Sequence, residues 1–406
     1  MKPGLERTRE LLRRLGDPHR AGYRVVHIGG TNGKGSTAAM VAAGLRAAGH
    51  RVGLYTSPAL QRWNERIQVD GRPIADGEVA ALAAEVRPAV EAMVREGYEQ
   101  PTEFEVTTAL AFLHYARQRV DWLVLEVGLG GRYDATNVVE DPAVTCITNV
   151  DLDHTEVLGP THRAIAWDKA GILKPGVPCV TGATHPEALA VLRDEARRVG
   201  APLLEVAPPP GPVAWDLTGQ VADLPGLPGA RIRLLGRHQL ANAACAARIL
   251  QVLGLPEAPI RRGLAEARWP GRLEVVPGDP PVLLDVAHNP AGAAALAQAV
   301  RDYLPGRPVV LVLGLLADKN VDGFLDALLP LARQAVAVTP DHPTRALPAR
   351  DLAAALARRG VAAAVAPSPE EALRRARALC PAGGAVLVAG SHYLVGPVRS
   401  LLVPVE

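Results

Sequence analysis

Short runs of β-branched and other apolar residues alternate along this chain with longer stretches rich in alanine and leucine, beginning near residue 23. Such alternation is typical of parallel strands connected by helices. The pattern predicts strands at residues 24–28, 51–55, 122–127, 143–148 and 177–181, and then at 282–286, 308–313, 335–338 and 385–388. We therefore predict an α/β fold built on parallel sheets.

A boundary is expected near residues 268–271 (RWPG), after which a new series of strands and helices begins. We predict a first domain over residues 1–268 and a smaller, Rossmann-like domain over residues 271–406. The Pro/Gly-rich stretch at 207–229 has two interpretations: a linker between domains, or an ordered excursion inside the first domain. The pattern leaves both open.

Composition removes several classes of function. The 406 residues carry 44 basic and 42 acidic side chains, so nothing indicates a nucleic-acid or anionic-membrane partner. The longest apolar runs, such as 309–316, are far shorter than the ~18 residues of a membrane span, and no signal-peptide core follows the N-terminus. We predict a cytoplasmic protein whose four scattered cysteines are buried thiols.

The strongest chemical signal is the glycine-rich segment 29–37 (GGTNGKGST), which follows a predicted strand and opens an alanine-rich helix expected at 38–48. Glycines let backbone N–H groups converge on phosphate oxygens, and the helix N-terminus adds positive potential. Lys34 is placed to reach the outer phosphates. Because Gly35 stands between Lys34 and Ser36, we interpret the segment as a variant phosphate loop.

Polar residues also follow the next predicted strands of this sheet. Glu126 ends one strand and is a candidate metal ligand, the alternative being a carboxylate that caps the glycine loop. Asp151, Asp153 and His154 follow another strand and are expected at the same sheet edge, in a metal or phosphate role. A histidine on Mg²⁺ is unusual, since this ion prefers oxygen ligands.

Lysine is scarce, with only five among the 44 basic residues. Lys169, at the end of a predicted helix, is either an ordinary surface lysine or an amine for carbamylation or proton transfer, which an arginine could not provide. In the second domain, Asp285 and His288 follow a strand, and Arg272 could contact a nucleotide phosphate from across a cleft.

These segments together resemble the folylpolyglutamate synthase/dihydrofolate synthase family of the Mur ligase superfamily, in order from about residue 20 to Gly396. The matching segments are 30–36 (GTNGKGS), 56–58 (TSP), 64–67 (NERI), 102–105 (TEFE), 126–137 (EVGLGGRYDATN), 153–155 (DHT), 168–172 (DKAGI), 236–239 (GRHQ), Asn242, 271–274 (GRLE) and 285–290 (DVAHNP).

The resemblance implies a P-loop ATP-binding domain followed by a glutamate ligase domain. It implies that the carboxylate of a pteroate or folate takes the γ-phosphate of ATP, and that the amine of L-glutamate then displaces phosphate. Mg²⁺ is the expected metal cofactor, with a monovalent cation as a further expectation. The expected partners are these small molecules alone, and the expected oligomeric state is a monomer.

The resemblance also implies roles for individual residues. The expected catalytic residues are Lys34, His154 and Lys169, the last carbamylated to give an oxygen ligand for a second metal. The remaining expected sites are metal ligands at Ser57, Glu126 and His154; ATP contacts at Gly33, Lys34, Gly35, Ser36, Asn242, Arg272, Asp285 and His288; and pterin contacts at Thr102, Glu103, Phe104, Tyr133, Asp134 and Ala135.

Two other functions remain as alternatives. One is a cell-wall Mur ligase acting on a UDP-muramoyl peptide, which the phosphate loop at residue 30 disfavours because it leaves no preceding UDP-binding domain. The other is a non-catalytic nucleotide switch, which would need the loop but not Glu126, His154 and Lys169. The sequence does not decide whether dihydrofolate synthase and folylpolyglutamate synthase activities are both present.

Overall fold

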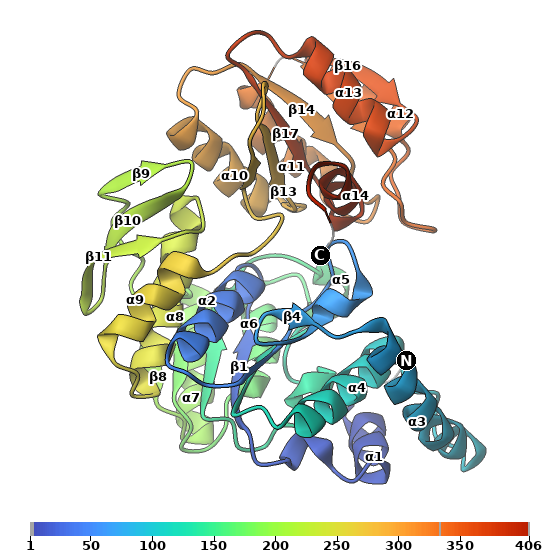
Figure 1. Cartoon of the computed structure of the whole chain (residues 1–406), viewed down its shortest axis with the longest axis vertical. Coiled ribbons are helices and arrows are strands. Elements are labelled where there is room, and N and C mark those ends of the chain that lie inside the picture. Colours follow the sequence, from blue (N-terminus) through green and yellow to red (C-terminus); the bar gives the residue numbers. More distant parts are fainter. Residues whose placement is uncertain (1–3, 333, 405–406) are drawn as a thin grey trace.

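A computed structural model describes residues 4–332 and 334–404. The outer ends of the two predicted domains, residues 1–3 and 405–406, lie outside this description. The chain forms two lobes joined near Trp269, each built around its own sheet (Figure 1). We call them the first lobe, up to residue 268, and the second lobe, from residue 271.

The first lobe contains an eight-stranded sheet in the order β4-β3-β2-β5-β1-β6-β7-β8. The six strands in the order β2-β5-β1-β6-β7-β8 are parallel, whereas β3 pairs antiparallel with β2, and β4 pairs antiparallel with β3, at one edge. The strands are β1 Arg24–Gly29, β2 Val52–Tyr55, β3 Ile67–Val69, β4 Arg72–Pro73, β5 Trp122–Glu126, β6 Val144–Ile147, β7 Cys179–Thr181 and β8 Leu203–Glu205. The α/β prediction is confirmed.

Alternate residues of the central strands face opposite layers of helices. In β1, Val26 and Ile28 pack with the layer of α2, α8 and α9, whereas Val25 packs with that of α1, α3 and α4. The helices of this lobe are α1 Glu6–Arg14, α2 Lys34–Ala47, α3 Asp76–Arg95, α4 Glu103–Gln118, α5 Thr155–Leu158, α6 His162–Lys169, α7 Pro186–Val199, α8 Arg237–Val252 and α9 Glu257–Glu266.

The Pro/Gly-rich stretch is an ordered excursion rather than a linker. It folds into an antiparallel sheet of β9 Ala214–Asp216, β10 Gly219–Leu224 and β11 Leu227–Ile232. Buried apolar residues of β10 and β11 join the core against α8 and α9. At its outer edge, Trp215 Nε1 donates to the carbonyl of Asp302 in the second lobe at 3.1 Å, so the excursion also braces the two lobes.

The second lobe contains a six-stranded sheet in the order β12-β13-β17-β14-β15-β16, parallel except for β12. Its strands are β12 Glu274–Val276, β13 Val282–Asp285, β14 Val309–Leu313, β15 Gln334–Val338, β16 Ala362–Ala366 and β17 Ala385–Ala389. Helices α10 Pro290–Tyr303, α11 Val321–Leu328 and α12 Ala349–Ala357 cover one face, and α13 Pro369–Leu379 and α14 His392–Leu402 cover the other.

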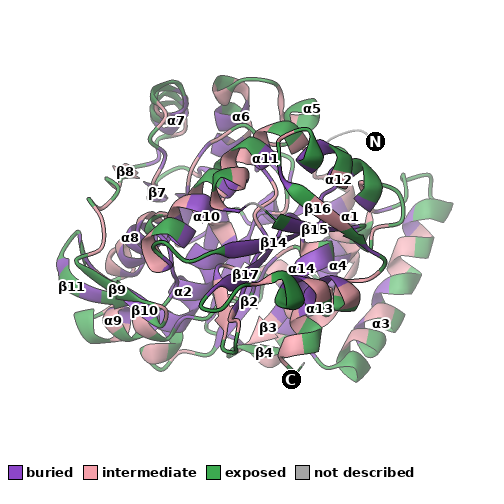
Figure 2. Ribbon diagram, turned by 90° about the horizontal axis from the view of Figure 1, so that it is seen from above, coloured by how far each residue is buried: buried purple, intermediate pink, exposed green. Residues whose placement is uncertain are grey.

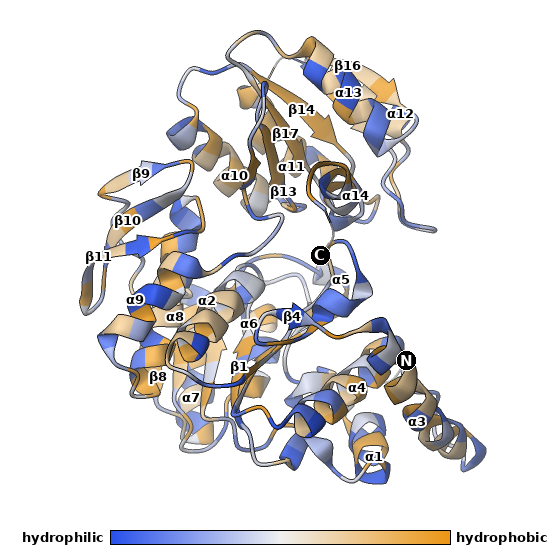
Figure 3. Cartoon of the chain, in the orientation of Figure 1, coloured by the Kyte–Doolittle hydropathy of each residue, from blue (hydrophilic) through white to orange (hydrophobic). Residues whose placement is uncertain are grey.

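The central strands form the buried interior of each lobe, while edge strands such as β16 and the outer sides of the helices are exposed (Figure 2). Strands β14 and β17 are fully buried and strongly apolar (Figure 3), as central parallel strands require. The apolar run at 309–316 is therefore core, and no described helix combines the length and apolar character that a bilayer crossing needs. Cys146, Cys179 and Cys245 are buried free thiols, and Cys380 is half-buried.

Candidate active site between the two lobes

A cavity of about 1530 Å³ lies between the lobes, at the carboxyl ends of the parallel strands of the first sheet. Of the predicted site residues, Glu103 alone is outside its lining; its exposed carboxylate pairs with Arg66 at 3.3 Å. The others all line the cavity: Gly33, Lys34, Gly35, Ser36, Ser57, Thr102, Phe104, Glu126, Tyr133, Asp134, Ala135, His154, Lys169, Asn242, Arg272, Asp285 and His288.

The glycine-rich segment forms a turn between β1 and α2. The helix begins at Lys34, earlier than the predicted 38–48, because the loop closes at Gly33 with φ 81°. A Cβ at Gly33 would lie 2.2 Å from Asn242 Oδ1, so only glycine fits. Lys34 Nζ donates to the carbonyls of Gly30 at 3.1 Å and Thr31 at 3.2 Å. The lysine thus folds over its own loop, where an anion would compete for its charge.

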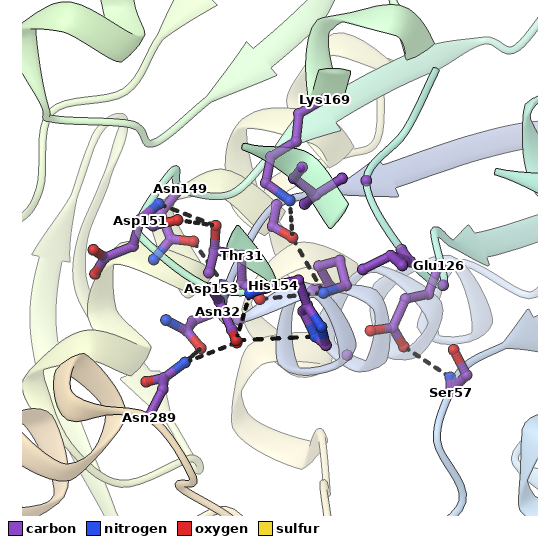
Figure 4. Close-up of a pocket in the computed structure, with 18 of the residues that line it drawn as sticks. Thr31, Asn32, Ser57, Glu126, Asn149, Asp151, Asp153, His154, Lys169 and Asn289 are labelled. Carbon is purple, nitrogen blue, oxygen red and sulfur yellow. Dashed lines mark hydrogen bonds and ion pairs between the residues drawn. The ribbon is translucent and has the colours of Figure 1, made fainter. Parts of the chain in front are cut away.

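Lys169 approaches the same loop from α6. It is only 3% exposed, and its Nζ donates to the carbonyl of Gly30 at 3.0 Å (Figure 4). Burial, and secondarily the positive charge of Lys34, lower the pKa of Lys169 to about 7. A substantial fraction of this amine is therefore neutral near neutral pH, which excludes the ordinary surface lysine considered from the sequence.

Glu126 ends β5 as a buried carboxylate that forms no ion pair with any residue the structure describes. It accepts one long hydrogen bond, 3.3 Å from the amide of Ser57 (Figure 4). Burial raises its pKa to about 7, although Lys34, Ser57 and Arg272 oppose the shift. A cation would relieve this desolvation, and the Ser57 hydroxyl adds an oxygen donor nearby. These residues therefore fit a divalent cation such as Mg²⁺, with His154 as a less usual nitrogen donor.

His154 and Asp153 follow β6 and behave differently. The His154 side chain is 42% exposed, with φ 50°, and the partial burial of its ring lowers its pKa. Asp153 is turned toward the second lobe: it accepts from Asn289 Nδ2 at 3.1 Å and from Lys319 Nζ at 3.0 Å. Asn289 also donates to Asn32 Oδ1 at 3.3 Å (Figure 4). These contacts across the cavity are not apparent from the sequence.

The second lobe contributes Arg272, Asp285 and His288. Asp285 accepts from the amides of Leu273 and Ala287, both at 2.7 Å, so it fixes the loop that carries Arg272. Burial lowers the pKa of Arg272, and the charges of Asp285 and Glu126 partly offset this. His288 Nε2 lies 3.6 Å from Asp153 Oδ2. A guanidinium of the second lobe thus lines the same cavity as the phosphate loop and interacts electrostatically with Glu126.

Helix α8 continues the polar lining of the first lobe. Asn242 Nδ2 donates to Gln239 Oε1 at 2.9 Å, and Gln239 Nε2 donates to Ser36 Oγ at 3.2 Å. All three side chains are buried. This relay connects the hydroxyl of the phosphate loop to the helix that follows the three-stranded sheet.

The predicted pterin residues line another part of the cavity. Thr102 caps α4, accepting from the amide of Glu105 at 3.1 Å, and Phe104 lies in the first turn of this helix. The carboxylate that lines the cavity on this helix is Glu105, paired with Arg7 at 3.0 Å, rather than Glu103. A buried carboxylate beside an aromatic ring suits a flat, polar heterocycle.

Asp134 and its neighbours complete this part of the lining. Asp134 is buried and accepts from the amides of Leu129 at 2.9 Å and Thr136 at 3.0 Å. Its pKa is nevertheless raised, because burial outweighs those bonds. Tyr133 is 46% exposed, and Ala135 is buried.

Comparisons with known proteins identify the family. Residues 28–179 match the Mur ligase middle domain, and residues 271–392 match the Mur ligase, glutamate ligase domain. The dihydrofolate synthase/folylpolyglutamate synthase of Bacillus subtilis is 38% identical, with 99% of this chain and 95% of that protein aligned.

Solved structures agree over the whole chain. Mycobacterium tuberculosis folylpolyglutamate synthase complexed with ADP superposes with a TM-score of 0.93 at 35% identity, covering 100% of this chain and 96% of that one. The bifunctional folylpolyglutamate synthase/dihydrofolate synthase from Yersinia pestis, complexed with AMPPNP and Mn ion, has a TM-score of 0.83 at 33% identity, covering 99% of this chain and 94% of that one.

Proposed function

This chain belongs to the folylpolyglutamate synthase/dihydrofolate synthase family of Mur ligases, and on that basis we propose that it joins L-glutamate to a folate or dihydropteroate carboxylate with conversion of ATP to ADP. It is an ADP-forming acid–amino-acid ligase. The observation that carries the proposal is the meeting of Lys34, Glu126, Lys169 and Arg272 around one cavity between the lobes.

The residues of the phosphate loop bind the nucleotide in this proposal. Backbone N–H groups at Gly33, Gly35 and Ser36 face the phosphates, and Lys34 exchanges its two carbonyl partners for phosphate oxygens. Arg272 approaches from the second lobe and stabilises the negative charge that spreads over the transferring phosphoryl group. Asn242, Asp285 and His288 support the nucleotide contacts.

Ser57, Glu126 and His154 would hold a divalent cation. Such an ion, when bound, shields phosphate charge so that the substrate carboxylate can approach. Glu126 then becomes a charged ligand instead of a desolvated carboxylate. The proposal extends to a monovalent cation, which is tested by comparing rates in potassium and sodium buffers.

Lys169 is proposed to react with CO₂. Carbamylation needs a neutral amine, and a pKa of about 7 supplies one. The ammonium first releases one proton; the neutral amine nitrogen then forms a bond to the carbon of CO₂, whose C=O π electrons move onto oxygen, and a second proton leaves the nitrogen. A buried cation thereby becomes an anionic oxygen ligand. This change also removes the repulsion between Lys169 and Lys34.

The wall formed by Thr102, Phe104 and residues 133–135 is proposed to bind the pterin, placing its carboxylate toward the phosphate loop. Glutamate then approaches from the second lobe, and its amine attacks the phosphorylated carboxylate. Both reactants are enclosed only when the lobes are together, which excludes water from the acyl phosphate.

We also propose a domain division, a cellular location and an oligomeric state. Two domains divide at residues 268–271; the protein works in the cytoplasm, where ATP and L-glutamate are present; and it is a monomer. Limited proteolysis tests the division, and light scattering tests the oligomeric state.

The decisive assay combines purified protein, MgATP and L-glutamate with one acceptor at a time: dihydropteroate, a reduced folate or a UDP-muramoyl peptide. ADP and product mass are followed. Products with both pteroate and folate establish a bifunctional enzyme, and product with only one identifies which activity is present. Two outcomes contradict the proposed function: ADP formation only with the muramoyl peptide, and the failure of all three acceptors to cause ADP formation.

A further inference from the structure

Three potential metal ligands meet outside the cavity, where helices α6 and α7 begin. His162 is the first residue of α6, His185 precedes α7, and Glu187 lies in the first turn of α7. Each offers one ligand atom, and these atoms lie within 4.8 Å of one another. None of the three residues lines the interlobe cavity, so the cluster is separate from the catalytic site.

The two imidazoles are stacked, with ring centroids 3.7 Å apart and planes inclined by 6°. Among the described residues, neither ring forms a hydrogen bond, and the buried Nδ1 of His185 has no partner. Asp151 Oδ1 lies 3.7 Å from His162 Nε2, beyond hydrogen-bonding distance. Nor does Glu187 form an ion pair with a described residue. Three potential metal ligands thus lie close together, and they form no hydrogen bonds with one another.

Ring stacking accounts for the contact between His162 and His185, but it leaves the buried Nδ1 of His185 without a hydrogen-bond partner. A buried polar atom without a partner is unfavourable, and a neutral imidazole carries a lone pair suited to a metal. Two ligand atoms on one zinc ion lie up to about 4 Å apart. The imidazoles would therefore turn out of their parallel stack on binding, so that both lone pairs point at one ion.

We propose that His162, His185 and Glu187 bind a late first-row divalent metal ion, with Zn²⁺ the best match. Two imidazoles and one carboxylate are a ligand set for zinc or its neighbours, whereas Mg²⁺ prefers oxygen alone. This site is therefore chemically distinct from the oxygen-rich site at Ser57 and Glu126. Three protein ligands leave one position for water.

Metal binding here would connect the start of α6 to the start of α7, two helices that already pack together. The far end of α6 carries Lys169, seven residues after His162 on the same short helix. On the other side, the backbone of Asp151 exchanges two hydrogen bonds with the Thr31 hydroxyl of the phosphate loop, at 3.0 and 3.1 Å. The ion would restrain the segment that positions Lys169.

Zinc titration in millimolar Mg²⁺ tests the site, with excess Mg²⁺ and a Glu126→Gln variant used to separate it from the catalytic one. We expect one Zn²⁺ per chain, a higher Tm with zinc, and a Co²⁺ absorption band in the visible range. His162→Gln and His185→Gln should each lower affinity by at least about tenfold, and Glu187→Gln should lower it less. His50→Gln, on another surface, is the matched control.

Circular dichroism first establishes that each variant is folded. Retention of zinc binding in Glu126→Gln together with its loss in both histidine variants supports the site. Unchanged affinity in both histidine variants, loss of binding in Glu126→Gln, or no binding of Zn²⁺ at micromolar concentrations overturns it and leaves the histidines as a stacked pair.

Discussion

Lys319 of the second lobe donates a hydrogen bond to Asp153 of the first at 3.0 Å, across 166 residues of sequence. Both side chains are only 11% exposed. Burial raises the pKa of Asp153, but the imidazole of His288, 3.6 Å away, and the charges of His154 and Lys319 outweigh it and hold the pKa well below its usual range. This desolvated pair therefore holds the lobes together at the cavity.

We predict that Asp153→Asn and Lys319→Met each lower kcat/KM by at least about tenfold, because removing one partner leaves the other buried without its counter-charge. The double variant should be little worse than either single one. Steady-state kinetics with all four proteins measures this coupling.

The ion pair between Arg237 and Asp302 is the matched control, since it also joins the lobes, at 2.8 Å, but Arg237 is 52% exposed. Arg237→Met should change kcat/KM by less than about threefold. Two results would show that the pair of Asp153 and Lys319 does not hold the lobes in their active arrangement. One is additive losses of kcat/KM in the double variant, and the other is an equal loss of kcat/KM in Arg237→Met.

Lys169 and Lys34 donate to the same carbonyl, that of Gly30, which places two lysines at one point of the phosphate loop. We predict that Lys169→Ala retains ATP binding but loses ligation by at least about a hundredfold, because the carbamate oxygens are absent. A short carboxylic acid should restore part of the rate by supplying those oxygens. Calorimetry with ATP and product mass measure the two effects.

Lys169→Arg separates charge from chemistry at this position. Arginine keeps the positive charge but cannot be carbamylated, so it should be inactive and unresponsive to added acid. Full activity of Lys169→Ala would remove the carbamate from the mechanism.

The sequence predicted the central strands because their apolar runs are long and their ends carry distinctive polar residues. It missed β16, since this strand is mostly alanine and alanine gives no strand preference. It also left 207–229 undecided, because proline and glycine mark turns whether they connect domains or short antiparallel strands. In β11, buried and exposed residues alternate only over Ala230, Arg231 and Ile232, because Pro228 and Gly229 interrupt the pattern before them.

Site residues at strand ends were predictable because parallel strands deliver their carboxyl ends to one edge of a sheet. The pairing of Asp153 with Lys319 was not, since it depends on how two independent sheets face each other. The choice of Glu103 rather than Glu105 as a pterin contact was an error over a short segment, since Glu105 is the residue that lines the cavity. The pattern T-x-x-E at 102–105 is a capping box, and recognising it would have directed attention to Glu105.

Glu126 should make stability depend on pH in the metal-free protein. Its pKa is about 7 when folded against an ordinary 4.5, so the folded state binds more protons between these values and stability falls as pH rises through them. Glu126→Gln should raise the free energy of unfolding by roughly 2–3 kcal/mol at pH 8 and change it little at pH 4. Urea denaturation at both pH values measures the difference.

Added Mg²⁺ provides the control for this prediction. It should stabilise the wild-type protein at pH 8 but have less effect on Glu126→Gln, which lacks the charged ligand. If Glu126→Gln raises the free energy of unfolding equally at pH 4 and pH 8, the gain comes instead from better packing of the glutamine amide.

Phe104 is held against Gly128, and this contact tests the pterin wall. A Cβ at Gly128 would lie 2.4 Å from Phe104 Cζ, so Gly128→Ala must displace the ring that lines the cavity. We predict that it raises KM for the pteroate or folate substrate by about tenfold with little change in KM for ATP. Gly77→Ala, with no atom near its Cβ, should change neither. In a Phe104→Ala background, Gly128→Ala should add no further effect, since the ring it displaces is gone; an undiminished effect there would assign the loss to the backbone at Gly128 rather than to Phe104.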